Sequence, residues 1–212
     1  KTMFEGYFYI SQGRMKFILA SNSPRRQHLL LRLHIPFDVI LPDIEESTII
    51  SDGSPETYCI KLAEMKANNI SQHYPNELVI GADTIVVLGD NILEKPDDIA
   101  EAKYMLQTLS GGTHQVYTGV CLKCADRKIH HLFSEITTVT FRDLDEKDIV
   151  HYIETYQPYD KAGAYGIQDW SAVFVKEIRG CYDNVVGFPI SRFYQELKKL
   201  GINLLDSISE PC

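Results

Sequence analysis

Two serines and two arginines near the start of the chain form a pattern that suits the binding of an anion. Ser23 followed by proline is typical of a helix start, because serine caps free N–H groups and proline fits the first turn. Arg25 and Arg26 then fall in that turn, where each positive charge opposes the helix dipole at a cost of about 0.3–1 kcal/mol. A phosphate would remove this cost, since N–H groups, both guanidinium groups and the hydroxyls of Ser21 and Ser23 would converge on it. The alternative is a pair of solvated arginines.

A carboxylate and a hydroxyl interrupt the apolar stretch from residue 78 to residue 88. Burying Asp83 in a strand is unfavourable unless the carboxylate is paired or binds a metal. The pattern therefore suggests a metal ligand or a base that activates water, with Thr84 beside it. The alternative is an aspartate at a strand end or bulge that faces solvent.

Three lysines and a glutamine are weaker candidates, because each is also common on a protein surface. Lys95 follows a predicted hairpin that returns it toward the strand carrying Asp83, and lysine is a suitable phosphate ligand. Lys66 lies on a predicted helix, and Lys161 begins a glycine-bearing segment whose backbone can approach a ligand closely. The amide of Gln168, at the end of that segment, can hydrogen-bond to a nucleotide base.

Strands and helices that would position these residues follow one another along the chain, which suits an α/β fold. Apolar runs predict strands over residues 16–20, 37–41, 78–88, 92–94, 116–122, 129–141 and 173–178. Capping residues and helical spacing predict helices that begin near residues 24, 55 and 96, and others over 145–156 and 189–200. We interpret residues 1–14 as a leader and residues 15–212 as a single domain, since no repeat or linker divides them.

The composition limits the classes of partner. The 212 residues suffice for a sizeable core without disulfides or a structural metal. With 21 basic and 29 acidic residues, the net charge of -8 argues against a general nucleic-acid binder, though not against a binder of small polyanions. No apolar run approaches the ~20 residues of a transmembrane helix, so we expect no membrane partner.

The cysteines and the missing motifs narrow the chemistry further. Five scattered cysteines, an odd number, favour a reducing compartment, and we expect a cytoplasmic protein. Cys121 and Cys124 form a CxxC, but a zinc site needs a second pair and a redox motif needs a helix start, so ordinary thiols are expected. The sequence also lacks a P-loop, a Rossmann fingerprint and histidines at metal-binding spacing.

Five motifs, taken together, resemble those of one known family. In chain order they are LASNSPRR at residues 19–26, GADT at 81–84, EKP at 94–96, KAGAYGIQ at 161–168 and NVVGFP at 184–189. They are similar to the motifs of the Maf (septum formation) family and cover the chain from Met15 to about Leu200. Their shared order makes the resemblance far more specific than any one motif.

The resemblance implies a nucleoside triphosphate pyrophosphatase, which cuts between the α and β phosphates and releases a nucleoside monophosphate and pyrophosphate. It also implies an α/β fold with an elongated mixed β-sheet, flanking helices and two lobes around a central cleft, similar to the inosine triphosphatase fold. A divalent metal, Mg²⁺ or Mn²⁺, and a homodimer are implied as well.

Residue roles follow from the resemblance by position. Asp83 matches the proposed proton acceptor, and together with Glu46 it matches the metal site. Positions that line the phosphate and metal site match Ser21, Arg26, Glu46, Lys66 and Lys95, and we expect Lys66 and Lys95 to act in catalysis with Asp83. Positions linked to base preference match Arg25, Thr84 and Gln168, and the substrate-binding set is completed by Ser23 and Lys161.

The substrate branch rests on the first two motifs. The arginine after Ser-Pro, with Thr84, resembles the branch that prefers dTTP and UTP, whereas the branch acting on 7-methyl-GTP carries tryptophan in place of Arg25. Two alternatives stay open: the same reaction on 7-methyl-GTP or purine nucleotides, and a non-catalytic nucleotide-binding regulator of cell division. One departure concerns the base pocket, because Asp169 follows Gln168 where we expect a glycine.

Overall fold

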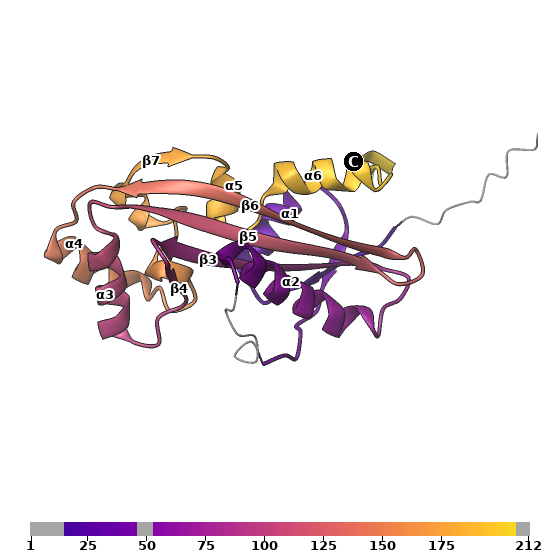
Figure 1. The fold of residues 1–212 in the computed structure, drawn as a ribbon, viewed down its shortest axis with the longest axis horizontal. Helices are drawn as coiled ribbons and strands as arrows, with labels where there is room; N and C mark the ends of the chain where they lie inside the picture. Colours follow the sequence, from indigo (N-terminus) through magenta and orange to yellow (C-terminus); the bar gives the residue numbers. More distant parts are fainter. Residues whose placement is uncertain (1–14, 46–52, 207–212) are drawn as a thin grey trace, which may run out of the picture.

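The computed structural model describes residues 15–45 and 53–206, which form a seven-stranded mixed β-sheet with flanking helices (Figure 1). The strands are β1 (Phe17–Ala20), β2 (Phe37–Val39), β3 (Leu78–Leu88), β4 (Asn91–Leu93), β5 (Thr113–Cys124), β6 (Ile129–Phe141) and β7 (Val175–Arg179). Their order is β2-β1-β3-β5-β6-β7, with β4 paired to β3. β1 runs parallel to β2 and β3, whereas the other pairs are antiparallel, so the predicted α/β mixed sheet is confirmed.

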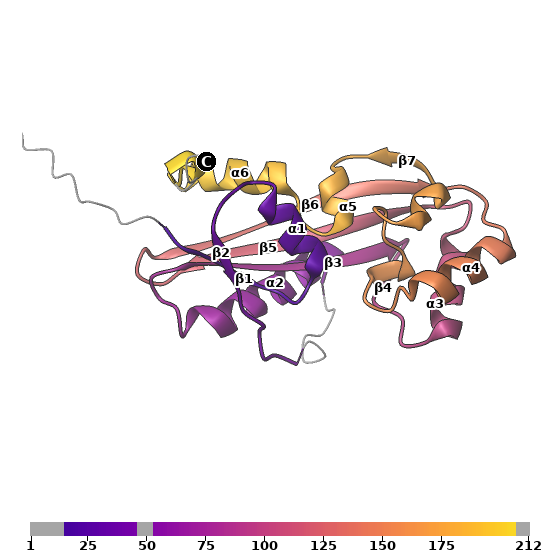
Figure 2. The same cartoon turned by 180° about the vertical axis from the view of Figure 1, so that it is seen from behind.

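Helices cover both faces of the sheet and one of its ends (Figures 1 and 2). The α-helices are α1 (Pro24–Leu31), α2 (Pro55–Ser71), α3 (Ile99–Leu109), α4 (Glu146–Tyr156), α5 (Tyr182–Val186) and α6 (Ile190–Lys199). α2 lies along one face, and α1, α5 and α6 lie on the other. α3 and α4 pack together at the end far from the β5–β6 turn, which makes the molecule elongated. No helix in the described ranges is long and apolar enough to span a membrane.

Strand β3 divides the core, because successive side chains of a strand point to opposite faces. Val79 and Val87 pack in the clusters beneath α2, whereas Ile80 joins the larger cluster on the other face. Gly81 belongs to the row that faces α2, and the helix comes so close that a Cβ there would meet its backbone. Asp83, two residues further on, therefore also faces α2.

The local structure differs from the sequence-based expectation at two places near the C-terminus. Residues 182–186 form α5, which was not predicted because five residues are too few to show helical spacing. The last strand begins at Val175 and not at residue 173, since the preceding residues form the 3₁₀ helix η3 (Trp170–Phe174). Asp169 caps η3, accepting a hydrogen bond from the Ser171 N–H, so the chain turns before it can extend.

The CxxC pair consists of ordinary buried thiols. Cys121 and Cys124 are three residues apart on β5, so their side chains point to opposite faces and join different core clusters. Both are free and buried. Burial raises the pKa of the Cys121 thiol to about 12, which keeps it protonated and unreactive at neutral pH.

His114 makes the stability of the fold depend on pH below neutrality. Its ring is buried against Phe141, and its Nε2 shares a 2.8 Å hydrogen bond with the hydroxyl of Tyr165. Burial lowers the pKa of His114 from 6.5 to about 4, so the unfolded chain binds the proton more readily than the folded one. The contribution of neutral His114 to the free energy of unfolding is fully present above pH 6.5. It is lost as the pH falls from 6.5 toward 4, and the loss amounts to about 3 kcal/mol.

Replacing His114 tests whether this residue causes the loss of stability at acid pH. His114→Gln is expected to flatten the fall in unfolding free energy between pH 6.5 and pH 4.5, because glutamine keeps a hydrogen-bonding group but does not titrate. Urea unfolding at pH 7.0, 5.5 and 4.5 measures the change. An equally steep fall in the variant would show that another group controls the acid stability.

Candidate active site

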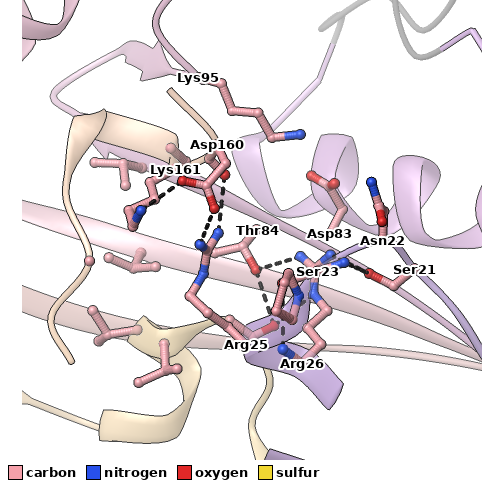
Figure 3. A pocket seen from close by; sticks show the side chains of 18 of the residues that line it. Ser21, Asn22, Ser23, Arg25, Arg26, Asp83, Thr84, Lys95, Asp160 and Lys161 are labelled. Atoms are coloured by element: carbon pink, nitrogen blue, oxygen red, sulfur yellow. Dashed lines mark hydrogen bonds and ion pairs between the residues drawn. The ribbon is translucent and has the colours of Figure 1, made fainter. Parts of the chain in front are cut away.

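A pocket of about 600 Å³ lies along an edge of β3, between the ends of two neighbouring strands (Figure 3). β1 pairs with β3 as far as Gly81 and β4 pairs from Val86, so in the described sheet no strand covers that edge between them. Because this part of the edge is open, side chains from both faces of the sheet reach the same pocket. Ten predicted site residues line it: Ser21, Ser23, Arg25, Arg26, Lys66, Asp83, Thr84, Lys95, Lys161 and Gln168. The eleventh, Glu46, lies outside the described residues.

A buried ion pair forms one side of the pocket. Asp83 lies within β3 with 8% of its surface exposed, so the interpretation as a solvent-facing strand end is wrong. Its Oδ1 accepts a hydrogen bond from Nζ of Lys66 on α2, at 2.5 Å, and Lys66 is itself buried. The carboxylate thus has the partner that a buried charge needs.

Arg26 forms the buried floor of the pocket. Its Nε donates to the carbonyl of Gly187 at 2.9 Å, and its Nη2 donates to the Thr84 hydroxyl at 3.0 Å. A weaker bond of 3.3 Å joins its Nη1 to the hydroxyl of Ser21. Thr84 in turn lies 2.9 Å from the Thr118 hydroxyl on β5. The guanidinium therefore ties the start of α1 to β3 and to the turn after α5.

Arg25 takes the opposite direction and lies at the rim of the pocket (Figure 3). Its guanidinium forms an ion pair with the Asp160 carboxylate and donates to the Asp160 carbonyl at 3.0 Å. Lys161 Nζ donates to the same carboxylate at 2.7 Å. Burial alone would raise the pKa of Asp160, but the hydrogen bonds from Lys161 and Arg25 outweigh it and hold the pKa below its usual range. An ionised Asp160 thus bridges two of the pocket's cations.

The remaining predicted residues lie at the start of α1 and around the pocket mouth. Ser23 is the N-cap of α1, as predicted, and accepts from the Arg26 N–H at 3.4 Å. The β3–β4 hairpin returns Lys95 to the pocket, and its amine projects toward the space beside Asp83 (Figure 3). Gln168 is exposed at the end of the segment that begins with Lys161.

Sequence reasoning missed Asp160, which lines the pocket, and Thr118, which contacts the pocket residue Thr84 from β5. Asp160 precedes Lys161 directly, but no local signal indicates that Arg25, 135 residues earlier, meets its carboxylate. Thr118 is one of several hydroxyl residues on a strand, and only the register that places it opposite Thr84 distinguishes it.

The described residues offer part of a site for a divalent cation. No group of three His, Cys, Asp or Glu side chains suited to a metal occurs among residues 15–45 and 53–206. Mg²⁺ is commonly held by one or two carboxylates together with substrate phosphates and water. The carboxylate of Asp83, beside basic groups that suit phosphates, fits a site that the substrate completes.

The arrangement suits hydrolysis of a phosphate anhydride. Basic side chains from α1, the β4 hairpin and the segment after α4 surround the space, and Asp83 supplies a carboxylate within it. Phosphoryl transfer depends mainly on positioning and on stabilising charge, with a base to orient and deprotonate the water. The pocket offers each of these elements.

Comparisons with known proteins find a family model and relatives that match most of the chain. The family model described as Maf-like protein matches residues 16–200. A dTTP/UTP pyrophosphatase of Bacillus cytotoxicus is 50% identical over 184 residues, which are 87% of this chain and 95% of that protein. A dTTP/UTP pyrophosphatase of Clostridium kluyveri is 44% identical over 194 residues, or 90% and 100% of the two chains. Among solved structures, a HAM1 protein from Coxiella burnetii aligns with a TM-score of 0.47 at 12% identity, over 87% of this chain and 99% of that chain.

Proposed function

This chain belongs to the family of Maf-like proteins, and from that premise we propose that it is a nucleoside triphosphate pyrophosphatase acting on dTTP and UTP. Relatives that carry the name dTTP/UTP pyrophosphatase share 50% and 44% of its residues over most of both chains. The observation that supports the reaction is the buried Asp83–Lys66 pair in a pocket lined by four further basic residues, Arg25, Arg26, Lys95 and Lys161.

The residues divide the work of the proposed hydrolysis. The water oxygen bonds to the α phosphorus, and Asp83 takes a proton from that water. The bond from the α phosphorus to the oxygen that bridges the α and β phosphates breaks, and this oxygen leaves with pyrophosphate. Lys66 holds the carboxylate in one orientation through its 2.5 Å hydrogen bond. The basic side chains around the pocket stabilise the charge that develops on the leaving group.

A divalent metal, Mg²⁺ or Mn²⁺, belongs to the proposal. Held by Asp83 and the substrate phosphates, it would neutralise phosphate charge and polarise the anhydride. Chelation with EDTA is expected to abolish turnover, and re-addition of either metal is expected to restore it. Turnover that survives exhaustive chelation would contradict the metal requirement and leave Asp83 as base alone.

Pyrophosphate release from dTTP, UTP, CTP, GTP and 7-methyl-GTP, measured side by side, tests the substrate class. We expect turnover of dTTP and UTP well above that of the others. A preference for 7-methyl-GTP or purine nucleotides would establish the same reaction on another base and refute the use of Arg25 and Thr84. Tight nucleotide binding without any turnover would favour a regulator of cell division.

The proposed setting is a cytoplasmic homodimer that binds neither nucleic acid nor membranes. The net charge of -8 supports it, since it disfavours binding of nucleic acid. The free thiols of Cys59, Cys121, Cys124 and Cys181 suit a reducing compartment. The family resemblance supports the dimer. Sedimentation velocity at micromolar concentration checks it, and a monomeric mass would overturn it.

A further inference from the structure

The turn that carries Gln168 is closed by a residue at which the sequence departs from the expected motif. Asp169 stands where we expect a glycine, yet its φ of −106° and ψ of −161° need none. Its Oδ1 accepts from the Ser171 N–H at 3.0 Å, and its Oδ2 accepts from the Tyr152 hydroxyl at 3.2 Å. The side chain therefore joins the turn to η3 and to α4.

Both partners of this aspartate also hold Gly166, at the other end of the turn. The Gly166 N–H lies 3.2 Å from the Tyr152 oxygen and 3.2 Å from the Ser171 oxygen. The Gly166 carbonyl accepts from the Ser171 hydroxyl at 2.8 Å and from the Asp169 N–H at 2.9 Å. Tyr152 and Ser171 are fully buried, so the network is fixed to the core.

The charge of the aspartate suits this arrangement. Burial and the negative charge of Asp169 raise the pKa of Tyr152 above its usual value, because both favour the neutral hydroxyl that donates to the carboxylate. A glycine at position 169 would leave this buried hydroxyl without that acceptor and would uncap the Ser171 N–H. Gln168 lines the pocket between the two fixed ends of the turn, so the backbone that carries it would be held less firmly.

We propose that Asp169 is a positioning residue that fixes the Gln168 amide for contact with the pyrimidine base of the substrate. The inference rests on the proposed function and adds a determinant of base recognition. Asp169 acts through the turn, whereas Asp83 on β3 and Arg26 on α1 come from other elements and act on the phosphates. Removing Asp169 should therefore weaken recognition of the base and leave recognition of the phosphates intact.

Steady-state kinetics with dTTP and UTP test the proposal in four variants: Asp169→Gly, Tyr152→Phe, Gln168→Ala and the double variant Asp169→Gly with Gln168→Ala. Asp169→Gly is expected to raise KM about tenfold, the effect of losing one good hydrogen bond, with kcat within about twofold of the wild type. Tyr152→Phe should change KM in the same direction. In the Gln168→Ala background, Asp169→Gly should add little, because its effect passes through the amide.

Inorganic tripolyphosphate, which has no base, serves as the matched probe of the phosphate site. Its inhibition constant should be the same in the wild type and in Asp169→Gly. Asp169→Asn keeps one of the two acceptor contacts and should fall between the wild type and the glycine variant. Melting temperatures show whether each variant is folded, and Asp169→Asn serves in place of any variant that is not.

Three results would overturn the inference. The first is an unchanged KM in Asp169→Gly. The second is a rise in KM as large when Asp169→Gly is made in Gln168→Ala as when it is made in the wild type. The third is a rise in the inhibition constant of tripolyphosphate that matches the rise in KM. A wild type that releases no pyrophosphate from any nucleotide would instead refute the proposed function. Dissociation constants for unhydrolysed dTTP in the same variants would then still decide the role of Asp169.

Discussion

Asp83→Asn is expected to lower kcat/KM for dTTP and UTP by about 10³-fold, the usual effect of removing a general base. Asparagine has nearly the same shape, so the pocket keeps its form, but the side chain can neither take a proton from water nor hold a cation through a charged oxygen. Pyrophosphate release under single-turnover and steady-state conditions measures the loss. The fall should appear in kcat, because the basic residues that line the pocket and are expected to bind the substrate, Arg25, Arg26, Lys95 and Lys161, are unchanged.

The matched control is Asp90→Asn, the same substitution at an exposed position in the β3–β4 turn. It should leave kcat and KM at wild-type values. Asp83→Asn also leaves the buried Lys66 ammonium without its carboxylate, which destabilises the fold. A double variant, Asp83→Asn with Lys66→Met, should regain stability without regaining activity. Asp83→Asn with more than a tenth of wild-type activity would remove Asp83 from the chemistry.

The sequence predicted the elements of this fold better than it predicted their contacts. Alternation and apolar runs are local signals, so β3 was placed correctly over residues 78–88, together with the hairpin that follows it. The short helix α5 was missed because five residues show no period. The strand that begins at Val175 was placed two residues early, because the cap that turns the chain there is a side-chain contact.

The site shows the same limit. Arg25 and Arg26 are neighbours in sequence and formed one signal, but about 100° separates successive residues around a helix. Arg26 consequently reaches the floor of the pocket, where it contacts Thr84 and Gly187. Arg25 reaches the rim, where it pairs with Asp160. Such pairings depend on how elements far apart in sequence pack together, which no local pattern records. The family motifs indicated which residues gather, and the packing decides what each one touches.

Gly81→Ala is expected to destabilise the protein by at least about 3 kcal/mol, the upper part of the range for overpacking, because the new methyl group would meet a helix backbone. The added Cβ would lie 2.8 Å from the amide nitrogen of Ala67 and 2.9 Å from its Cβ, and would also press on the carbonyl of Ala63. Backbone cannot move aside as a flexible side chain can, so α2 as a whole must shift. Urea unfolding at pH 7 measures the change in free energy.

Gly53→Ala is the matched control, because it lies just before the same helix and its added Cβ would make only ordinary contacts with Thr57. Its free energy of unfolding should stay within about 0.5 kcal/mol of the wild type. Lys66 is carried on α2, so in Gly81→Ala the shift that relieves the clash also draws its ammonium away from Asp83. The folded fraction of that variant should therefore lose activity as well as stability, in contrast to Gly53→Ala. Wild-type stability and turnover in Gly81→Ala would show that the close approach of α2 to β3 does not set the geometry of the ion pair.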